Sequence, residues 1–196
     1  RHTRSNYSQY KQFHRPLPAI HADKMNPRSY LLGSFSIAVK AADPAHIVPQ
    51  HLPSPPKGRT LVIGAGKAAA AMALAVENAW PSSVQLDGLV VTRYRHKLPT
   101  QRIKVIEAGH PIPDENGKQA AREILAAVKA LKSDDLLLCL FSGGGSSLLS
   151  LPVDGISLQE LKEVTHQLLW CGARIQEINT VRKHLSAIQG GRLAAA

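Results

Sequence analysis

The chain has 196 residues, of which 44% are hydrophobic, so it can bury the core of at least one sizeable domain. Its formal net charge is +10, but the basic residues are scattered and only 5% of residues are aromatic, which argues against a nucleic-acid-binding face. No apolar run approaches the roughly 18 residues that a membrane-spanning helix needs. The totals predict a globular protein with small anions as ligands and with neither nucleic acid nor membrane as a partner.

The first 24 residues differ in composition from the rest. They begin without Met, contain two prolines, and carry five basic side chains against one acidic side chain. We interpret residues 1–24 as a disordered or non-native leader and residues 25–196 as the domain. A mitochondrial presequence is the alternative, because the stretch is basic and poor in acidic residues, although its prolines would interrupt an amphipathic helix.

The elements of the first half follow from periodicity and breakers. A helix is predicted from residue 27 to the Asp43-Pro44 step, with Tyr30, Leu31, Phe35, Ala38 and Val39 near one face. Residues 46–57, which contain four prolines, are predicted to be a linker. Strands are expected at 61–63, 88–92 and 103–106, with a helix of small residues at 68–79 between the first two.

The second half continues the alternation. Asp114 is the expected cap of a helix whose core face spans 120–131, and residues 136–141 are predicted to be a strand covered on both faces. Cys139 and Cys171 lie in apolar runs, so both are expected to be buried, reduced thiols, with a disulfide or a catalytic nucleophile as the alternatives. Reduced thiols indicate a cytoplasmic setting. Two helices are predicted after the strand 136–141. The first begins with a capping box at 157–160, and the second ends at 190–191. The chain is thus expected to be α/β, a three-layer α/β/α Rossmann-like parallel sheet.

Two glycine-rich runs follow predicted strands, and in a parallel sheet ligands collect at those carboxyl ends. Lys67 follows the first run and could place an ammonium group on a phosphate or carboxylate, although an exposed lysine after a tight turn is the structural alternative. Three consecutive glycines flanked by serines are expected where backbone amides face an anion, although a purely structural loop stays open. The candidate cofactor-binding residues are Gly64, Gly66, Ser142, Gly143, Gly144, Gly145, Ser146 and Ser147.

The first run also matches the relaxed dinucleotide pattern G-x-G-x-x-[GA], which is weak when taken alone. The second strand ends in Thr92-Arg93 and not in the acidic residue that binds the ribose of NAD, so only an NADP-like site would fit. The G-x-x-x-x-G-K-[ST] phosphate loop, the G-x-S-x-G elbow and metal-ligand spacing of Cys and His are all missing from the sequence. We therefore predict no metal ligands.

His110 and one face of the last long helix complete the candidate residues. His110, between Gly109 and Pro111, could act as a base or hydrogen-bond donor, or simply be a turn residue. Asn179, Arg182 and Lys183 lie on nearby turns of one predicted helix, where a solvated polar face is the alternative.

Four of these stretches, in this order, resemble the glycerate 2-kinase family, whose members are often labelled hydroxypyruvate reductases. The matching stretches are 61–69, 108–114, 141–149 and 177–186, followed by Gly-Gly-Arg-Leu at 190–193. The resemblance covers residues from about 28 to 196. Gln189 departs from it, because the family commonly has Lys before the Gly-Gly pair.

The resemblance implies transfer of the γ-phosphoryl group of ATP to the 2-hydroxyl of D-glycerate with Mg²⁺. By the family's pattern Lys67 is the catalytic residue and the loop 142–147 holds phosphate or glycerate. The candidate substrate-binding residues are His110, Asn179, Arg182 and Lys183. Family members are about twice as long, so the chain is expected to be an incomplete N-terminal domain of a two-domain enzyme and to be inactive alone. A homodimer is one assembly that the sequence leaves open. An NADP-dependent hydroxypyruvate reductase and a non-catalytic sugar-phosphate-binding module are the alternative functions.

Overall fold

The computed structural model describes residues 26–196, so the predicted leader at 1–24 lies outside the described part of the chain. The described residues divide into two units at residue 40, and the unit that carries the sheet is residues 41–196. Among the helices of residues 26–196, none is long and apolar enough to cross a membrane.

The first described helix is α1 (Pro27–Ala41), which confirms the predicted helix. Its large apolar side chains are exposed, Phe35 by 68% and Leu31 by 67%. Part of the predicted linker is helical: α2 (Pro44–Ile47) is followed by the short 3-10 helix η1 (Val48–His51). Proline is tolerated in a first helical turn, and the Asp43 side chain caps α2 by accepting a hydrogen bond from Ala45 N.

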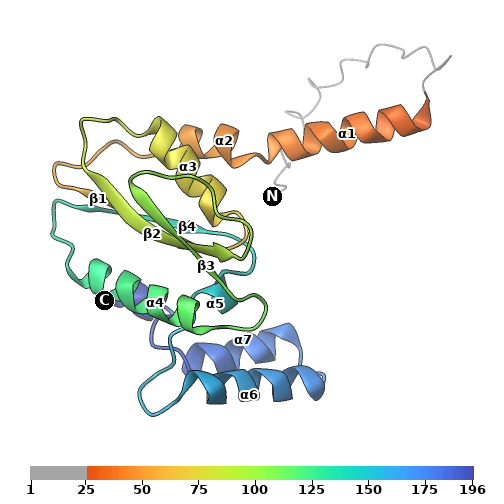
Figure 1. The fold of residues 1–196 in the computed structure, drawn as a ribbon, viewed down its shortest axis with the longest axis vertical. Helices are drawn as coiled ribbons and strands as arrows, with labels where there is room; N and C mark the ends of the chain where they lie inside the picture. The colour runs from red at the N-terminus through yellow and green to blue at the C-terminus, as the bar shows by residue number, and fades with distance from the viewer. Residues whose placement is uncertain (1–25) are drawn as a thin grey trace, which may run out of the picture. The chain divides into compact units, whose positions relative to one another are not determined.

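The sheet contains the four predicted strands, all of them parallel. These are β1 (Thr60–Ala65), β2 (Leu86–Arg93), β3 (Ile103–Ala108) and β4 (Leu136–Phe141), in the order β3-β2-β1-β4 (Figure 1). β1 pairs with both β2 and β4, and Thr60 is in register with Leu86 and with Leu136. The carboxyl ends of β1 and β4 therefore lie next to each other, which places the two glycine-rich runs side by side.

Helices cover both faces of this sheet, which confirms the three-layer α/β/α arrangement (Figure 1). α3 (Ala69–Ala79) packs on one face and α4 (Glu115–Lys129) on the other. The side chains of β1 alternate between the two layers, because successive residues of a strand point to opposite faces. Ile63 belongs to the cluster that includes α4, whereas Val62 belongs to the cluster that includes α3.

β4 is an edge strand, and the prediction that it is covered on both faces is wrong. It pairs with β1 only, Phe141 is 51% exposed, and Cys139 is exposed. Cys171 is also exposed, at the end of α6 (Leu158–Trp170), so the prediction of two buried thiols is wrong as well. An apolar run does not reveal whether a neighbouring strand or helix covers it.

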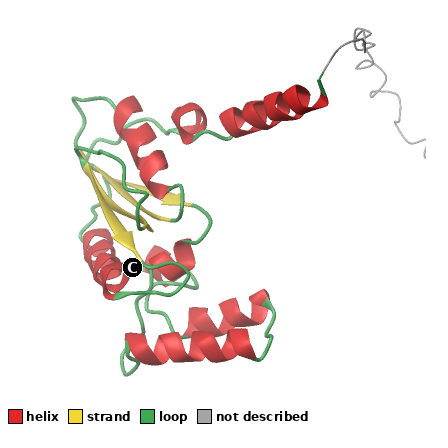
Figure 2. Cartoon of the chain, turned by 45° about the vertical axis from the view of Figure 1, so that its right-hand side comes forward, coloured by secondary structure: helices red, strands yellow, loops and turns green. Residues whose placement is uncertain are grey.

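The C-terminal third contains the single turn α5 (Gly145–Leu148), the helix pair α6 and α7 (Ile175–His184), and the short α8 (Arg192–Ala195) (Figure 2). The predicted capping box of Ser157 and Glu160 opens α6. α7 ends at His184 and does not continue to Gly190, because the next segment turns back to form a bridge between Ser186 and Pro152.

Candidate active site

The two glycine-rich runs are joined directly by hydrogen bonds. Ser142 N donates to Ala65 O at 3.1 Å, and Lys67 N donates to Gly143 O at 2.9 Å. The Ser142 hydroxyl accepts a hydrogen bond from Ala68 N at 3.0 Å. The turn after β1 and the loop after β4, residues 142–147, therefore form one surface at the carboxyl end of the sheet.

Two glycines in this surface occupy positions that a larger residue would not fit. Gly66 has φ +141° and Gly144 has φ +90°, in the region that L side chains rarely adopt. A Cβ on Gly66 would collide with the Ser142 hydroxyl, and one on Gly144 would lie 2.7 Å from His110 Nε2. The glycines thus allow the two runs and His110 to approach one another.

Lys67 and His110 approach the loop at Gly144. Lys67 is exposed, and its Cε lies 3.6 Å from the position that a Cβ on Gly144 would take. Burial, together with the positive charges of Lys67 and Arg93, lowers the pKa of His110 below its ordinary value. The lowered pKa favours the neutral imidazole of His110 beside Lys67.

The loop after β4 presents free backbone donors, whereas the turn after β1 does not. The N–H groups of Gly66, Lys67, Ala68 and Ala69 all donate within the protein. By contrast, within residues 26–196 no hydrogen bond engages the N–H groups of Gly143, Gly144 or Ser146. Gly143 and Ser146 are exposed and Gly144 is half-buried, so these three N–H groups are open to water or to an anion.

Of the three polar residues predicted on the last long helix, the structure brings one to the loop. Arg182 donates from Nη2 to Ser146 O at 2.9 Å and from Nη1 to Ser146 Oγ at 3.4 Å. Burial lowers the pKa of Arg182. Asn179 and Lys183 are exposed, and their side chains make no hydrogen bond to any other residue in the range 26–196.

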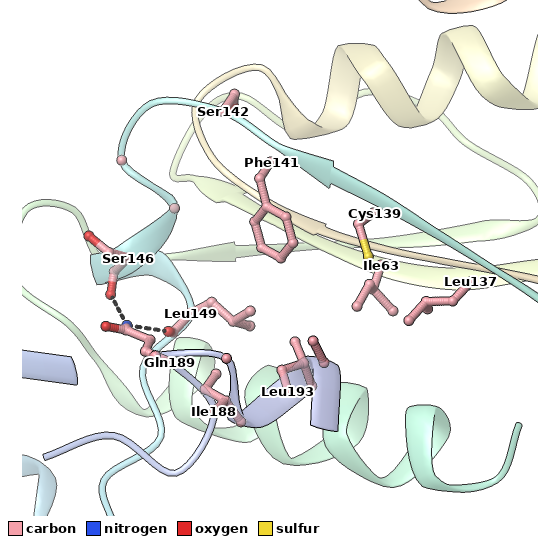
Figure 3. A pocket seen from close by; sticks show the side chains of 15 residues that line it. Ile63, Leu137, Cys139, Phe141, Ser142, Ser146, Leu149, Ile188, Gln189 and Leu193 are labelled. Carbon is pink, nitrogen blue, oxygen red and sulfur yellow. Dashed lines mark hydrogen bonds between the residues drawn. The ribbon is translucent and has the colours of Figure 1, made fainter. Parts of the chain in front are cut away.

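A cavity of about 570 Å³ adjoins the loop on the open side of β4 (Figure 3). Its walls are mostly apolar, and Ser142 and Ser146 supply hydroxyl groups at one end. Neither Lys67 nor His110 lines the cavity. Both residues lie close to Gly144, which does line it, so the cavity and the Lys67–His110 pair are adjacent. The lining residues are Ile63, Leu137, Cys139, Phe141, Ser142, Gly144, Gly145, Ser146, Leu149, Ile188, Gln189, Gly190, Gly191, Leu193 and Ala194.

The sequence did not point to Tyr94 and identified Gln189 only as a departure from the family pattern. Tyr94 OH donates to Asp114 Oδ2 at 2.6 Å, and this hydrogen bond is the main reason that the pKa of Tyr94 is raised. Gln189 donates to the carbonyl of Ser146. These contacts join residues 20 and 43 positions apart, and a local sequence pattern does not predict contacts at such separations.

The fold and the site define a three-layer parallel α/β domain of the kind that places its ligand site at the carboxyl ends of the strands. Comparison with known protein families identifies the family of this domain. The chain belongs to the family described as Domain of unknown function (DUF4147), whose model matches residues 30–196.

Relatives of known name are similar over most of the chain. A putative hydroxypyruvate reductase of Agrobacterium vitis is 53% identical over 172 residues, which cover 88% of this chain and 39% of the relative. A D-glycerate 2-kinase of Thermotoga maritima is 44% identical over 158 residues, covering 80% of this chain and 38% of the relative. The crystal structure of a glycerate kinase from Thermotoga maritima superposes with a TM-score of 0.76 at 39% identity, over 86% of this chain and 41% of that one. The chain thus spans about two fifths of the length of these relatives.

Proposed function

We propose that this chain contributes the Lys67-bearing part of a kinase that transfers the γ-phosphoryl group of ATP to the 2-hydroxyl of D-glycerate. The observation that carries the proposal is the loop 142–147, which has three free N–H groups and meets Lys67 and His110 at Gly144. Phosphoryl transfer needs positioning and charge neutralisation more than covalent chemistry, and backbone donors with one lysine supply both. The names of the Thermotoga maritima relatives support the same activity.

In this proposal each residue has a role that follows from its place. Lys67 is the catalytic residue and neutralises negative charge that moves with the phosphoryl group, while the residues of the loop bind phosphate oxygens. His110, neutral at pH 7, forms a hydrogen bond to the hydroxyl of the acceptor. Arg182 stands beside the Ser146 hydroxyl and contributes positive charge at the far end of the loop, and Asn179 and Lys183 on the same helix stay predicted substrate contacts.

The geometry favours a kinase over a reductase that binds NADP. A dinucleotide pyrophosphate is bound by free N–H groups in the turn after the first strand, and here those of residues 66–69 already have acceptors. Arg93, which would meet the 2′-phosphate of NADP, donates from Nε to His96 Nε2 at 2.9 Å. The reductase name of the Agrobacterium vitis relative therefore has no support from this turn.

Mg²⁺ belongs to the proposal as the companion of ATP. Residues 26–196 contain no group of three or more His, Cys, Asp or Glu side chains that could hold a metal ion. Asp114, on the loop after His110, accepts from Gly117 N through Oδ1 and from Tyr94 OH through Oδ2. A cation would thus be bound chiefly by the phosphates of the nucleotide, as Mg²⁺ often is. The cytoplasmic location and a homodimer stay predictions.

The proposal is tested by binding and by turnover. The chain should bind MgATP saturably in isothermal titration, and a chimera of the Thermotoga maritima D-glycerate 2-kinase that carries residues 30–196 of this chain should form 2-phosphoglycerate, followed by ³¹P NMR. We expect Lys67→Met to lower kcat/KM of the chimera on the order of a hundredfold, because one charge-stabilising group is lost. Lys104→Met, at an exposed lysine paired with Glu123, is the matched control.

Two results would overturn it. Absence of MgATP binding by the chain together with absence of turnover by a folded chimera would exclude the kinase. Full turnover in Lys67→Met would remove Lys67 from the catalytic role. Binding of sugar phosphates by the chain without turnover by a folded chimera would instead favour the non-catalytic binding module.

A further inference from the structure

Gln189, from the segment between α7 and α8, reaches the single turn α5 that follows the glycine loop. Its Nε2 donates to Ser146 O at 2.8 Å and to Leu149 O at 3.3 Å (Figure 3). An amide nitrogen has two hydrogens, so both are used, one on a carbonyl inside α5 and one on the carbonyl of the residue that caps its end.

We propose that Gln189 is a positioning residue that fixes α5 and, through it, the loop 142–147 in the conformation that binds the ligand. The inference deepens the function proposed above and rests on it for the identity of the ligand. Gln189 is assigned no contact with substrate and acts only through the two carbonyl groups.

The need for such a residue follows from the size of α5. The helix has four residues, and a single helical turn is unstable without tertiary contacts because fixing its backbone costs more than its few hydrogen bonds return. Its N-cap, Gly144, has φ +90° and makes no side-chain capping bond. External hydrogen bonds to the carbonyls of α5 supply the missing stabilisation.

Gln189 is itself held in place by the backbone on either side of it. Ala187 N donates to Leu151 O at 2.7 Å and Val153 N donates to Leu185 O at 3.0 Å, so this segment pairs with the chain that leaves α5. Gln189 N donates to Ser186 Oγ at 3.1 Å. The amide nitrogen of Gln189 is thereby kept opposite Ser146 and Leu149.

Arg192 holds the segment that carries Gln189. Its Nη1 donates to the carbonyls of Lys183 at 2.7 Å, Ser186 at 3.0 Å and Gln189 at 3.3 Å. Arg182 adds a second donor to Ser146 O. The hydrogen bonds form a continuous connection from α7 and α8 to the loop, and Gln189 is the residue in it that contacts both Ser146 and Leu149.

The chemistry of the contact separates variants of similar size. A residue at 189 must donate two hydrogen bonds, so Lys can replace Gln, whereas Glu, ionised at neutral pH, offers acceptors only. Gln189→Glu would place a carboxylate against two carbonyl oxygens. Gln189→Met keeps a similar volume without any donor.

The experiment uses the full chain and two readouts, amide hydrogen exchange of residues 142–149 and the affinity for MgATP. We expect Gln189→Glu and Gln189→Met to raise exchange in this segment about tenfold and to weaken MgATP binding about tenfold, since a local opening replaces the held conformation. Gln189→Lys should restore both values to within about threefold of the wild type. Gln176→Glu, at an exposed glutamine of α7, is the matched control and should change neither.

The outcomes separate this proposal from the proposed function. If the wild-type chain binds no MgATP and the folded chimera has no turnover, the kinase proposal fails, while exchange still decides whether Gln189 holds the loop. Unchanged exchange in residues 142–149 of Gln189→Glu would overturn the positioning role. So would equal loss of binding in Gln189→Lys and Gln189→Glu when both variants unfold at the wild-type temperature, because the role requires that donors rescue.

Discussion

Gly143 and Gly144 are neighbours in the same loop, yet only one of them needs to be glycine. Gly144 has φ +90° and faces His110 Nε2, whereas a Cβ on Gly143 would meet nothing within 4 Å. We expect Gly144→Ala to lower the free energy of unfolding by about 2 kcal/mol, since it combines a left-handed backbone with a collision. Gly143→Ala should stay within about 0.5 kcal/mol of wild type.

Urea denaturation followed by circular dichroism measures both variants. Equal stability of the two would show that neither the left-handed backbone nor the approach of His110 constrains Gly144. A loss confined to Gly143→Ala would contradict the conformation of the whole loop.

His110 provides a test of the charge of the site. Its pKa is lowered by burial first and then by the positive charges of Lys67 and Arg93. The pKa of His110 is lower in the folded chain than in the unfolded chain. At acid pH the unfolded chain therefore binds more protons at this residue, and the residue lowers the stability of the fold. The penalty is absent above the unfolded pKa of about 6.5 and complete below the folded pKa.

Titration of the His110 ring by NMR measures this effect. We expect a midpoint below that of an exposed histidine, and a higher midpoint in Lys67→Met, since one repelling charge is removed. Lys104→Met should leave the midpoint unchanged because Lys104 pairs with Glu123 at another exposed position. A midpoint that does not respond to Lys67→Met would place Lys67 too far from His110 for a joint role.

At the scale of elements, Asp114 connects the start of α4 with the end of β2. Its Oδ1 accepts from Gly117 N at 3.0 Å, and its Oδ2 accepts from Tyr94 OH at 2.6 Å. Asp114→Ala should cost about 1–2 kcal/mol of unfolding free energy because the helix cap and the tyrosine contact are both lost. It should also lower the pKa of Tyr94 toward its ordinary value.

The matched control is Asp154→Ala, at an exposed aspartate, which we expect to change stability by no more than about 0.5 kcal/mol. Thermal and urea unfolding give the stability difference, and absorbance of the tyrosinate gives the titration. If Asp114→Ala were as stable as Asp154→Ala, the cap would contribute nothing to α4.

Sequence patterns over a few residues predicted where helices and strands lie better than they predicted where those elements end or how exposed they are. The capping box of α6 and the cap of α4 were predicted, because each is a contact between residues three apart. The end of α7 was not, since the bridge between Ser186 and Pro152 that replaces its last turns joins residues far apart in sequence. The exposure of Cys139 and Phe141 likewise depends on what lies beside β4.

For the molecule as a whole, the open edge of the sheet makes a measurable difference to the thiols. Cys139 on β4 is exposed, but its thiol is partly shielded from water, and this desolvation raises the pKa of the thiol. In Cys171→Ser, we expect Cys139 to react with Ellman's reagent in the native chain, more slowly than after unfolding, because less thiolate is present. Reaction only after unfolding would mean that β4 is covered.

The relatives are about two and a half times as long as the part that matches this chain, since it covers 38–41% of them. A catalytic centre assembled from Lys67, His110 and the loop 142–147 is therefore proposed for the longer polypeptide, and the chimera addresses it directly. Binding by the chain alone and turnover by the chimera are separate measurements for this reason.

The sequence by itself determined the parallel α/β fold, the four strands, and the two glycine-rich runs at their carboxyl ends. Hydrophobic periodicity, glycine and capping residues act over a few positions, so they can be recognised without a structure. Only the tertiary structure decided that β4 is an exposed edge, that Arg182 lies against Ser146, and that Gln189 connects to α5. These contacts join residues 36 and 43 positions apart, and such pairs are chosen by the packing of the whole chain.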